Sequence, residues 1–194
     1  MYKIEATIPW DQLEQSLRQT PLLHPRNGET VYPYEDADIN LVRLSYDEVS
    51  PTTLYVVRNN LAVQIAINSD LEAVGVHPLE LEGGLTLSNG TGKSVGLIPP
   101  IVEHTDAEGK YILDGAHRTT LGRAQGGTHF MGVLVSGIRE DCPGYAYPNA
   151  WQDIVVVDEV PKDPAKKKHY RGDNYASLYR DFSFLNGGSM RIAK

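Results

Sequence analysis

Apolar and polar residues alternate in several short stretches of the chain and recur every three or four residues in others, a mixture typical of an α/β protein. Alternation or a short apolar run predicts strands at 2–8, 39–44, 101–104, 111–113, 130–136 and 154–157. Helical spacing predicts three helices. One begins near Trp10, one covers 117–125, and the third includes Tyr175, Leu178, Tyr179 and Phe182.

The region between residues 45 and 75 reads as mainly helical. A capping-box pattern at 45–48 predicts one short helical turn. An amphipathic helix ending near Asn68 is predicted from four apolar residues at helical spacing: Leu54, Val57, Leu61 and Ile65. A second short helix at 71–74 should end at Gly75, because glycine readily adopts the left-handed conformation that follows a helix.

Residues 79–97 have the pattern of an insertion. Side chains alternate on both sides of Gly83-Gly84, which predicts a β-hairpin over 79–87. The following stretch, Ser88 to Ser94, is not a phosphate-binding P-loop. Leu87 stands where that motif requires glycine, and prolines follow soon afterwards where it requires a helix.

These patterns together predict one compact, mixed α/β (α+β) domain. An N-terminal arm covers 1–38, a core covers 39–160 with the hairpin insertion at 79–97, and a basic linker with a C-terminal helix covers 161–194.

Composition and net charge limit the kinds of molecule that the protein is expected to bind. The chain has 194 residues, a formal net charge of −7 and no apolar run long enough to span a membrane. An acidic balance disfavours nonspecific binding to nucleic acid. The basic run at 161–171 either contacts phosphates or is a solvated linker, and the linker is the interpretation we favour. With Cys142 as the only cysteine and no signal peptide, we expect a cytoplasmic protein.

The strongest candidate site is the stretch Asp114-Gly115-Ala116-His117-Arg118-Thr119-Thr120, which joins a predicted strand to a predicted helix. A helix N-terminus leaves backbone N–H groups unpaired and favours an anion. Arg118 adds a guanidinium suited to phosphate, the threonines add hydroxyls, and His117 can exchange a proton near neutral pH. A surface turn with no ligand is the alternative, and the pattern by itself favours neither.

This motif is similar to that of the ParB/sulfiredoxin-like superfamily. The resemblance rests on Pro100-Ile101-Val102, on the run from Tyr111 to Arg118 and on Leu121 to Gly126, and it covers 98–135 best. The Asp-Gly-x-His-Arg form looks most like the free-serine-kinase branch. Ala116 replaces the cysteine that sulfiredoxin chemistry requires, so we discard that activity.

The resemblance implies a ParB/sulfiredoxin-like fold and a nucleotide-dependent phosphotransferase that acts on a small hydroxyl metabolite such as a free amino acid. It implies an adenine nucleotide (ADP or ATP) and Mg²⁺, with phosphates held by residues 114–120. Glu103 is a weak candidate for holding magnesium through water. His117 would stabilise developing charge, and Asp114 would fix the turn or position magnesium.

One departure complicates the kinase hypothesis. The serine-kinase branch carries a catalytic glutamate soon after a proline like Pro51, but Thr52 and Thr53 follow here. Asp47 or Glu48 could act as the base instead. The alternatives are a ParB-like DNA-binding or nuclease protein, which the net charge disfavours, and a noncatalytic nucleotide sensor.

Overall fold

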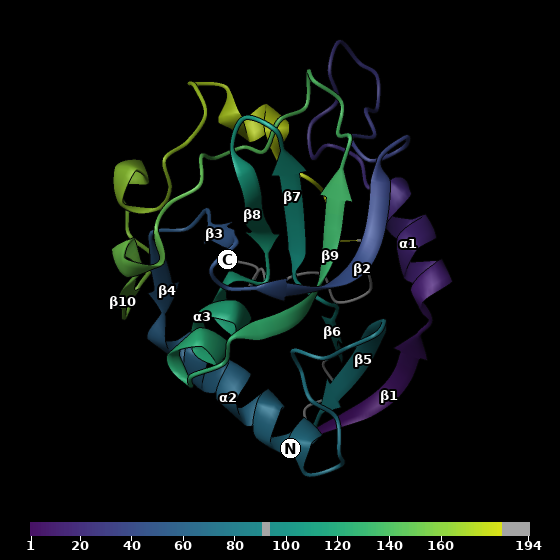
Figure 1. Ribbon diagram of the computed structural model, residues 1–194, viewed down its shortest axis with the longest axis vertical. Helices are drawn as coiled ribbons and strands as arrows, with labels where there is room; N and C mark the ends of the chain where they lie inside the picture. The colour runs from purple at the N-terminus through teal and green to yellow at the C-terminus, as the bar shows by residue number, and fades with distance from the viewer. Residues whose placement is uncertain (91–93, 184–194) are drawn as a thin grey trace.

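A mixed five-stranded sheet forms the centre of the molecule in the computed structural model, which describes residues 1–90 and 94–183 (Figure 1). Its strands lie in the order β2 (Asp38–Ser45), β9 (His129–Ser136), β7 (Ile101–Thr105), β8 (Gly109–Asp114) and β3 (Val49–Pro51). The pairs β2–β9 and β7–β8 are antiparallel, whereas β9–β7 and β8–β3 are parallel. The mixed α/β class and the strands of the predicted core are therefore confirmed.

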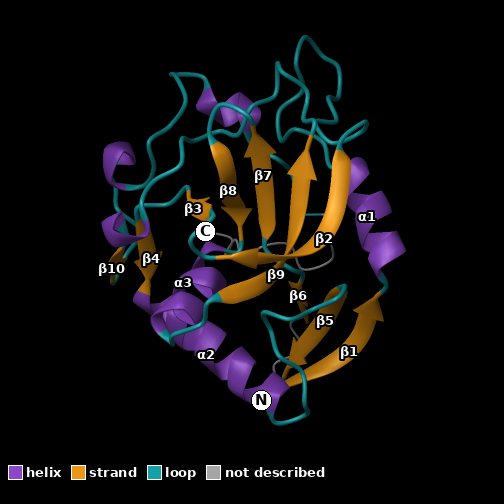
Figure 2. Ribbon diagram, viewed as in Figure 1, coloured by secondary structure: helices purple, strands orange, loops and turns teal. Residues whose placement is uncertain are grey.

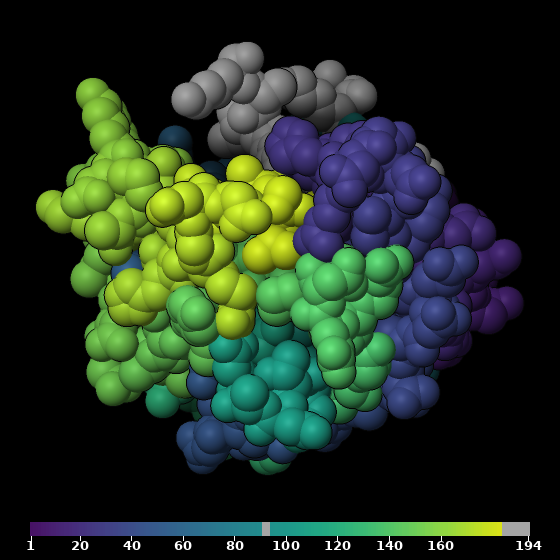
Figure 3. Space-filling view, turned by 90° about the horizontal axis from the view of Figure 1, so that it is seen from above, coloured from purple at the N-terminus to yellow at the C-terminus, as the bar shows by residue number. Residues whose placement is uncertain are grey.

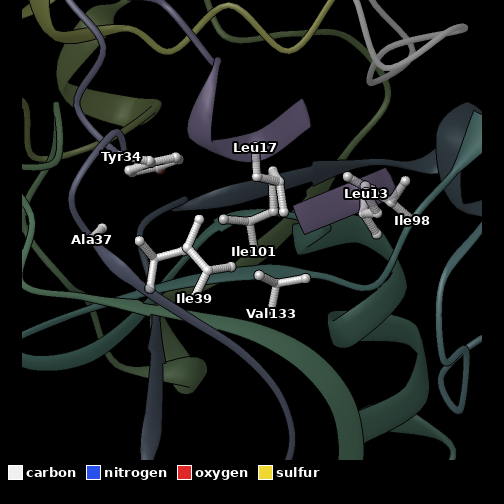
Figure 4. Packing of buried hydrophobic residues seen from close by; sticks show 9 residues of the cluster. Leu13, Leu17, Tyr34, Ala37, Ile39, Ile98, Ile101 and Val133 are labelled. Atoms are coloured by element: carbon white, nitrogen blue, oxygen red, sulfur yellow. The ribbon is translucent and has the colours of Figure 1, made fainter. Parts of the chain in front are cut away.

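Alternation along the central strands sends apolar side chains to both faces of this sheet. On one face, Ile101 and Val133 pack against Leu13 and Leu17 of helix α1 (Trp10–Arg18) (Figure 4). On the other face, a second cluster contains Leu44, Leu79, Val102, Ile112 and Phe130. Burial on both faces explains the unbroken apolar run Tyr111-Ile112-Leu113 in β8.

A second, antiparallel sheet joins the N-terminus to the predicted insertion. Its order is β1 (Tyr2–Ile8), β5 (Gly84–Asn89) and β6 (Ser94–Leu97). The predicted insertion at 79–97 does contain an antiparallel strand pair, but it is formed by β5 and β6 and not over 79–87. The bounds were wrong because 79–82 forms no strand and β5 pairs on its other edge with β1. Leu79 and Leu81 are instead buried in two different hydrophobic clusters, so they do not lie on one face of a common strand. Gly92 and Lys93 of the rejected P-loop lie outside the described residues.

Helix α2 (Arg58–Glu72) is one continuous helix where two were predicted. Val57 belongs to strand β4 (Tyr55–Val57), which pairs in parallel with β10 (Val155–Val157). The helix buries Gln64, Ile67 and Leu71, while Ile65 is 50% exposed, so the predicted apolar face was misplaced. Gly75 has φ of +79° just beyond the helix, as expected of a residue at that position.

The turn at residues 45–48 joins β2 to β3 and is not helical. The capping-box contact itself forms, because the Ser45 backbone N–H donates to Glu48 Oε1 at 2.9 Å. The same hydrogen bond that starts a helix can also close a tight turn, and here the strand on each side prevents helical continuation.

Helix α3 (Ala116–Ala124) connects β8 to β9, and the described chain after β9 wraps around this core without another α-helix (Figure 2). It contains short 3₁₀ turns at Trp151–Asp153, Pro164–Lys166 and Tyr175–Leu178.

The predicted C-terminal helix is therefore reduced to the last of these turns within the described residues, and 184–194 lie outside them. Backbone hydrogen bonds from Leu23 N–H to Tyr179 O and from Asp181 N–H to Pro21 O hold the segment extended. Figure 3 shows this yellow segment beside the purple segment that follows α1.

Candidate anion-binding cavity

The predicted strand–turn–helix motif forms as expected. Strand β8 ends at Asp114, Gly115 is the N-cap with φ of +92°, and α3 starts at Ala116. A Cβ on Gly115 would lie 2.9 Å from Pro100 Cβ, so the turn packs too closely against Pro100 for a larger residue. No side chain in the described part of the chain caps the helix, so its first N–H groups are available to a ligand.

A cavity of about 270 Å³ opens at this helix start. Asp114, Gly115, Ala116, His117 and Arg118 line it, so five of the seven motif residues are brought together as predicted. Further walls come from β4, α2, β6 and the C-terminal segment: Tyr55, Gln64, Ile67, Leu97, Lys168 and Phe182 are among the residues they contribute.

Arg118 is the most unusual residue of this cavity. It is only 5% exposed, and its Nη1 atom is buried without a hydrogen-bond partner among the described residues. Burial lowers the pKa of Arg118 to about 10, against the opposing effect of the Asp114 carboxylate, so the guanidinium stays charged at neutral pH. A buried charged donor that lacks a partner is unfavourable, and an anion in the cavity would relieve that cost.

His117 is held as a neutral hydrogen-bond donor. The Val57 backbone N–H donates to Nε2 at 3.1 Å, which leaves the proton on Nδ1. Burial lowers the pKa of His117, and the positive charge of Lys168 lowers it further. The imidazole can therefore donate a hydrogen bond to a ligand at neutral pH without carrying charge.

Lys168 is a second cation in the cavity, although it lies in the basic run for which the sequence favours a solvated linker. Its Nζ donates to Thr52 Oγ1 at 3.3 Å and lies 5.0 Å from the centre of the Tyr145 ring. Burial lowers the pKa of Lys168 to about 8, and Asp114 partly opposes this. The linker interpretation is wrong at Lys168, because the backbone folds back over the cavity.

Thr119 and Thr120 do not line the cavity. The Thr119 hydroxyl donates to the backbone oxygens of Gly115 and Ala116 within the helix, both at 3.1 Å. The Thr120 hydroxyl is buried and has no partner. Among the predicted phosphate ligands, these two lie farther along α3, and the geometry gives them no direct role.

The candidate bases Asp47 and Glu48 lie in the β2–β3 turn and are not among the residues that line the cavity. Glu48 forms an ion pair with Lys110 at 2.5 Å, and this hydrogen bond lowers the pKa of Glu48. The structure therefore does not bring either carboxylate to the site that the motif forms.

Glu103 lies in a different buried cluster. It is 0% exposed and accepts hydrogen bonds from Tyr34 at 2.5 Å, from Tyr111 at 3.0 Å and from Arg180 at 3.0 Å. Both of its oxygens are occupied by protein donors, and it does not line the cavity. A structural ion pair explains this carboxylate better than a magnesium site does.

Two further observations concern the chain as far as it is described. No cluster of three or more His, Cys, Asp or Glu side chains there is arranged to hold a metal ion. None of the helices in residues 1–90 and 94–183 has the length and apolar character needed to cross a membrane.

The fold and the cavity define a mixed α/β domain with a cavity at the strand–glycine–helix turn that starts α3. A comparison with protein-family models matches residues 12–156 to the ParB CE domain. This match covers well over half of the chain, which therefore belongs to the ParB CE domain family. Searches of curated proteins and of solved structures gave no match.

Sequence reasoning missed several residues of the cavity. Tyr55, Gln64, Tyr145 and Lys168 all line it, but they come from segments far from the motif along the chain. Gln64 is 4% exposed on the buried face of α2, a polar residue at a core position. That pattern was the one signal in the sequence that could have pointed to α2 as a wall of the site.

Proposed function

We propose that this protein binds the phosphate chain of a nucleotide in the α3 cavity and transfers a phosphoryl group to a small hydroxyl metabolite such as a free amino acid. The observation that carries the proposal is Arg118, whose buried Nη1 has no partner beside the uncapped start of α3. Both features supply donors to an anion, and phosphate fits both.

The cavity also suits the other parts of a nucleotide complex. Asp114 is the one carboxylate among the described residues that line it, and it would hold Mg²⁺. Magnesium typically takes one or two carboxylates together with substrate phosphates, so a single aspartate is sufficient. Ile67, Leu97 and Phe182 give the cavity an apolar side that suits a nucleobase, for which adenine (ADP or ATP) is our candidate.

Phosphoryl transfer depends mainly on positioning and on charge stabilisation. Arg118 and the helix start would bind the phosphates, and the Nδ1–H of His117 would donate to an oxygen that gains negative charge. A strong base is a smaller requirement, because the transition state is loose. The distance of Asp47 and Glu48 from the cavity lining is therefore compatible with the reaction.

A noncatalytic nucleotide sensor is the second candidate. It is favoured by the same placement of Asp47 and Glu48, since the cavity lining then contains no carboxylate besides Asp114 in the described chain. A sensor would bind nucleotide and form no phosphorylated product, which separates it from the enzyme in a single assay.

The ParB-like DNA-binding or nuclease alternative has less support. In the basic run, Lys168 faces the cavity, and Arg171 forms an ion pair with Glu108 at 2.7 Å. Two of its cations are thus engaged within the protein, and the chain carries a net charge of −7. Retardation of duplex DNA at low salt would reverse this ranking.

The test is a thermal-shift panel with ADP, ATP, CTP and GTP, each with and without magnesium. A ligand that binds only the folded state at about 100 times its Kd adds roughly 2.7 kcal/mol of stability. We expect a shift with ADP or ATP that Arg118→Ala abolishes. Arg123→Ala on the same helix is the matched control, because Arg123 is exposed and does not line the cavity.

A shift retained in Arg118→Ala would overturn the binding site. For the reaction, phosphorus NMR of the nucleotide with hydroxyl-bearing free amino acids should show a new phosphomonoester in wild type. Binding without any phosphorylated product across such a panel would favour the sensor.

A further inference from the structure

Neither the motif at 114–120 nor the family match accounts for the presence of Lys168 in the cavity. It follows residue 156, where the match to the ParB CE domain ends, and yet it lines the same cavity as Arg118. The segment that carries it reaches the cavity from outside the region that defines the family.

The backbone around Lys168 is held firmly on both sides. The Leu54 N–H donates to Lys167 O at 2.9 Å, and the Tyr147 N–H donates to His169 O at 2.8 Å. The Arg171 N–H donates to Tyr145 O at 3.0 Å. Lys168 is thus presented to the cavity by a segment fixed between two neighbours, which limits the entropy lost when its ammonium group binds a ligand.

The two cations reach the cavity from separate elements. Arg118 comes from the first turn of α3, and Lys168 comes from the segment that lies between Leu54 and the loop at 145–147. Asp114 is the only negative side chain in the described lining, so the cavity carries excess positive charge in addition to the dipole of α3. Donors at two points suit an anion that extends between them.

We propose that Lys168 is a second phosphate-binding residue, which contacts a different phosphate from the one bound by Arg118 and α3. The site would then select a chain of phosphates over a single phosphate. This inference rests on the proposed nucleotide binding and adds to it the residue that recognises the length of the phosphate chain.

Inorganic tripolyphosphate and inorganic phosphate test this without any assumption about the nucleobase. Isothermal titration calorimetry would compare wild type with Lys168→Met, which retains the apolar stem and removes the charge. We expect tripolyphosphate affinity to fall about tenfold or more, as expected for a lost charge-assisted hydrogen bond. Affinity for phosphate should change by less than about threefold, because Arg118 and α3 still bind it.

Two further variants serve as controls. Lys168→Arg should retain most of the tripolyphosphate affinity, because it keeps the positive charge. Lys166→Met should change it by less than about twofold, since Lys166 is exposed and its charge is screened by salt. Thermal unfolding of every variant establishes that it folds, and Lys168→Gln replaces Lys168→Met if the methionine variant does not.

An independent readout is lysine acetylation followed by mass spectrometry. Tripolyphosphate should protect Lys168 and leave the acetylation of Lys166 unchanged. Equal protection of both lysines, or an equal loss of affinity for both anions in Lys168→Met, would overturn the inference.

The outcomes also separate this inference from the proposed function. Wild type that binds tripolyphosphate but no nucleotide would refute the proposed function and leave the role of Lys168 intact. Nucleotide and tripolyphosphate binding that Lys168→Met leaves unchanged would refute the role of Lys168 and leave the proposed function intact.

Discussion

Two buried arginines in this protein have opposite surroundings. Arg180 is 2% exposed and donates to Glu103 and to the backbone oxygens of Cys142, Pro143 and Leu178. Arg118 is 5% exposed and has a buried Nη1 with no partner.

Their pKa shifts reflect the same contrast. Burial alone would lower the pKa of Arg180, but Glu103 and Tyr34 outweigh it and raise that pKa above its usual value. For Arg118, burial prevails and the pKa falls to about 10. The difference teaches that the fold itself satisfies Arg180, whereas it leaves one buried donor of Arg118 without a partner among the described residues.

The largest effect is expected from breaking the satisfied pair. Glu103→Gln should lower the free energy of unfolding by about 3–5 kcal/mol, because it leaves the Arg180 guanidinium buried without a countercharge. Equilibrium unfolding in urea measures this change. Glu14→Gln is the control, since it removes a partly exposed i,i+4 helical pair with Arg18, a kind of pair that is worth roughly 0.3–0.5 kcal/mol. Losses of similar size in the two variants would contradict the structural role of Glu103.

A smaller effect is expected at the unsatisfied arginine. Arg118→Met should change the free energy of unfolding by less than about 1 kcal/mol or increase it, because it replaces a buried donor that has no partner with an apolar side chain of similar length. The same urea experiment, without nucleotide, measures it. Destabilisation as large as that of Glu103→Gln would mean that Arg118 is held by the fold after all.

The smallest effect is a pH dependence that comes from Lys168. Its pKa is about 8 in the folded protein against an ordinary value of 10.5. Below pH 8 the lysine is protonated in both states, and the folded state bears the cost of burying the charge. Between pH 8 and pH 10.5 Lys168 holds its proton in the unfolded chain but loses it in the folded protein, so the free energy of unfolding should rise with pH.

Unfolding of wild type and of Lys168→Met, compared at pH 7 and pH 10, isolates this contribution. Asp114, His117, Tyr55 and Tyr145 share the cavity and are present in both proteins, so their titration largely cancels in the difference. Wild type should gain stability relative to the variant as the pH rises. A constant difference would show that Lys168 titrates normally in the fold.

The sequence predicted the part of the fold in which the pattern along the chain and the tertiary packing agree. Strands β7, β8 and β9 formed as expected, because each buries apolar side chains in the two clusters of the central sheet. Helix α3 also formed as expected, although the residues it buries are Arg118, Thr119 and Gly122. The seven-residue motif also predicted the position of the cavity, because residues close together in sequence set the geometry of a strand, a glycine turn and a helix start.

The remaining errors arose where partners are distant in sequence. Strand β5 pairs with β1 at the N-terminus, and no local signal near Gly83-Gly84 indicates this distant partner. Lys168 lay in a basic run that usually marks solvent exposure, and only the hydrogen bonds to Leu54 and Tyr147 turn it inward. Which strands pair across a long stretch of sequence depends on packing throughout the core, and the local amino-acid composition gives little indication of it.

The position of Lys168 also has a consequence for the order in which the protein becomes functional during synthesis. Chains fold from the N-terminus as they leave the ribosome, and the segment that matches the family is complete at residue 156. The cavity at that moment lacks the walls supplied by Lys168 and Phe182. The buried Arg180 that pairs with Glu103 also follows residue 156, so the last part of the described chain completes both the core ion pair and the cavity.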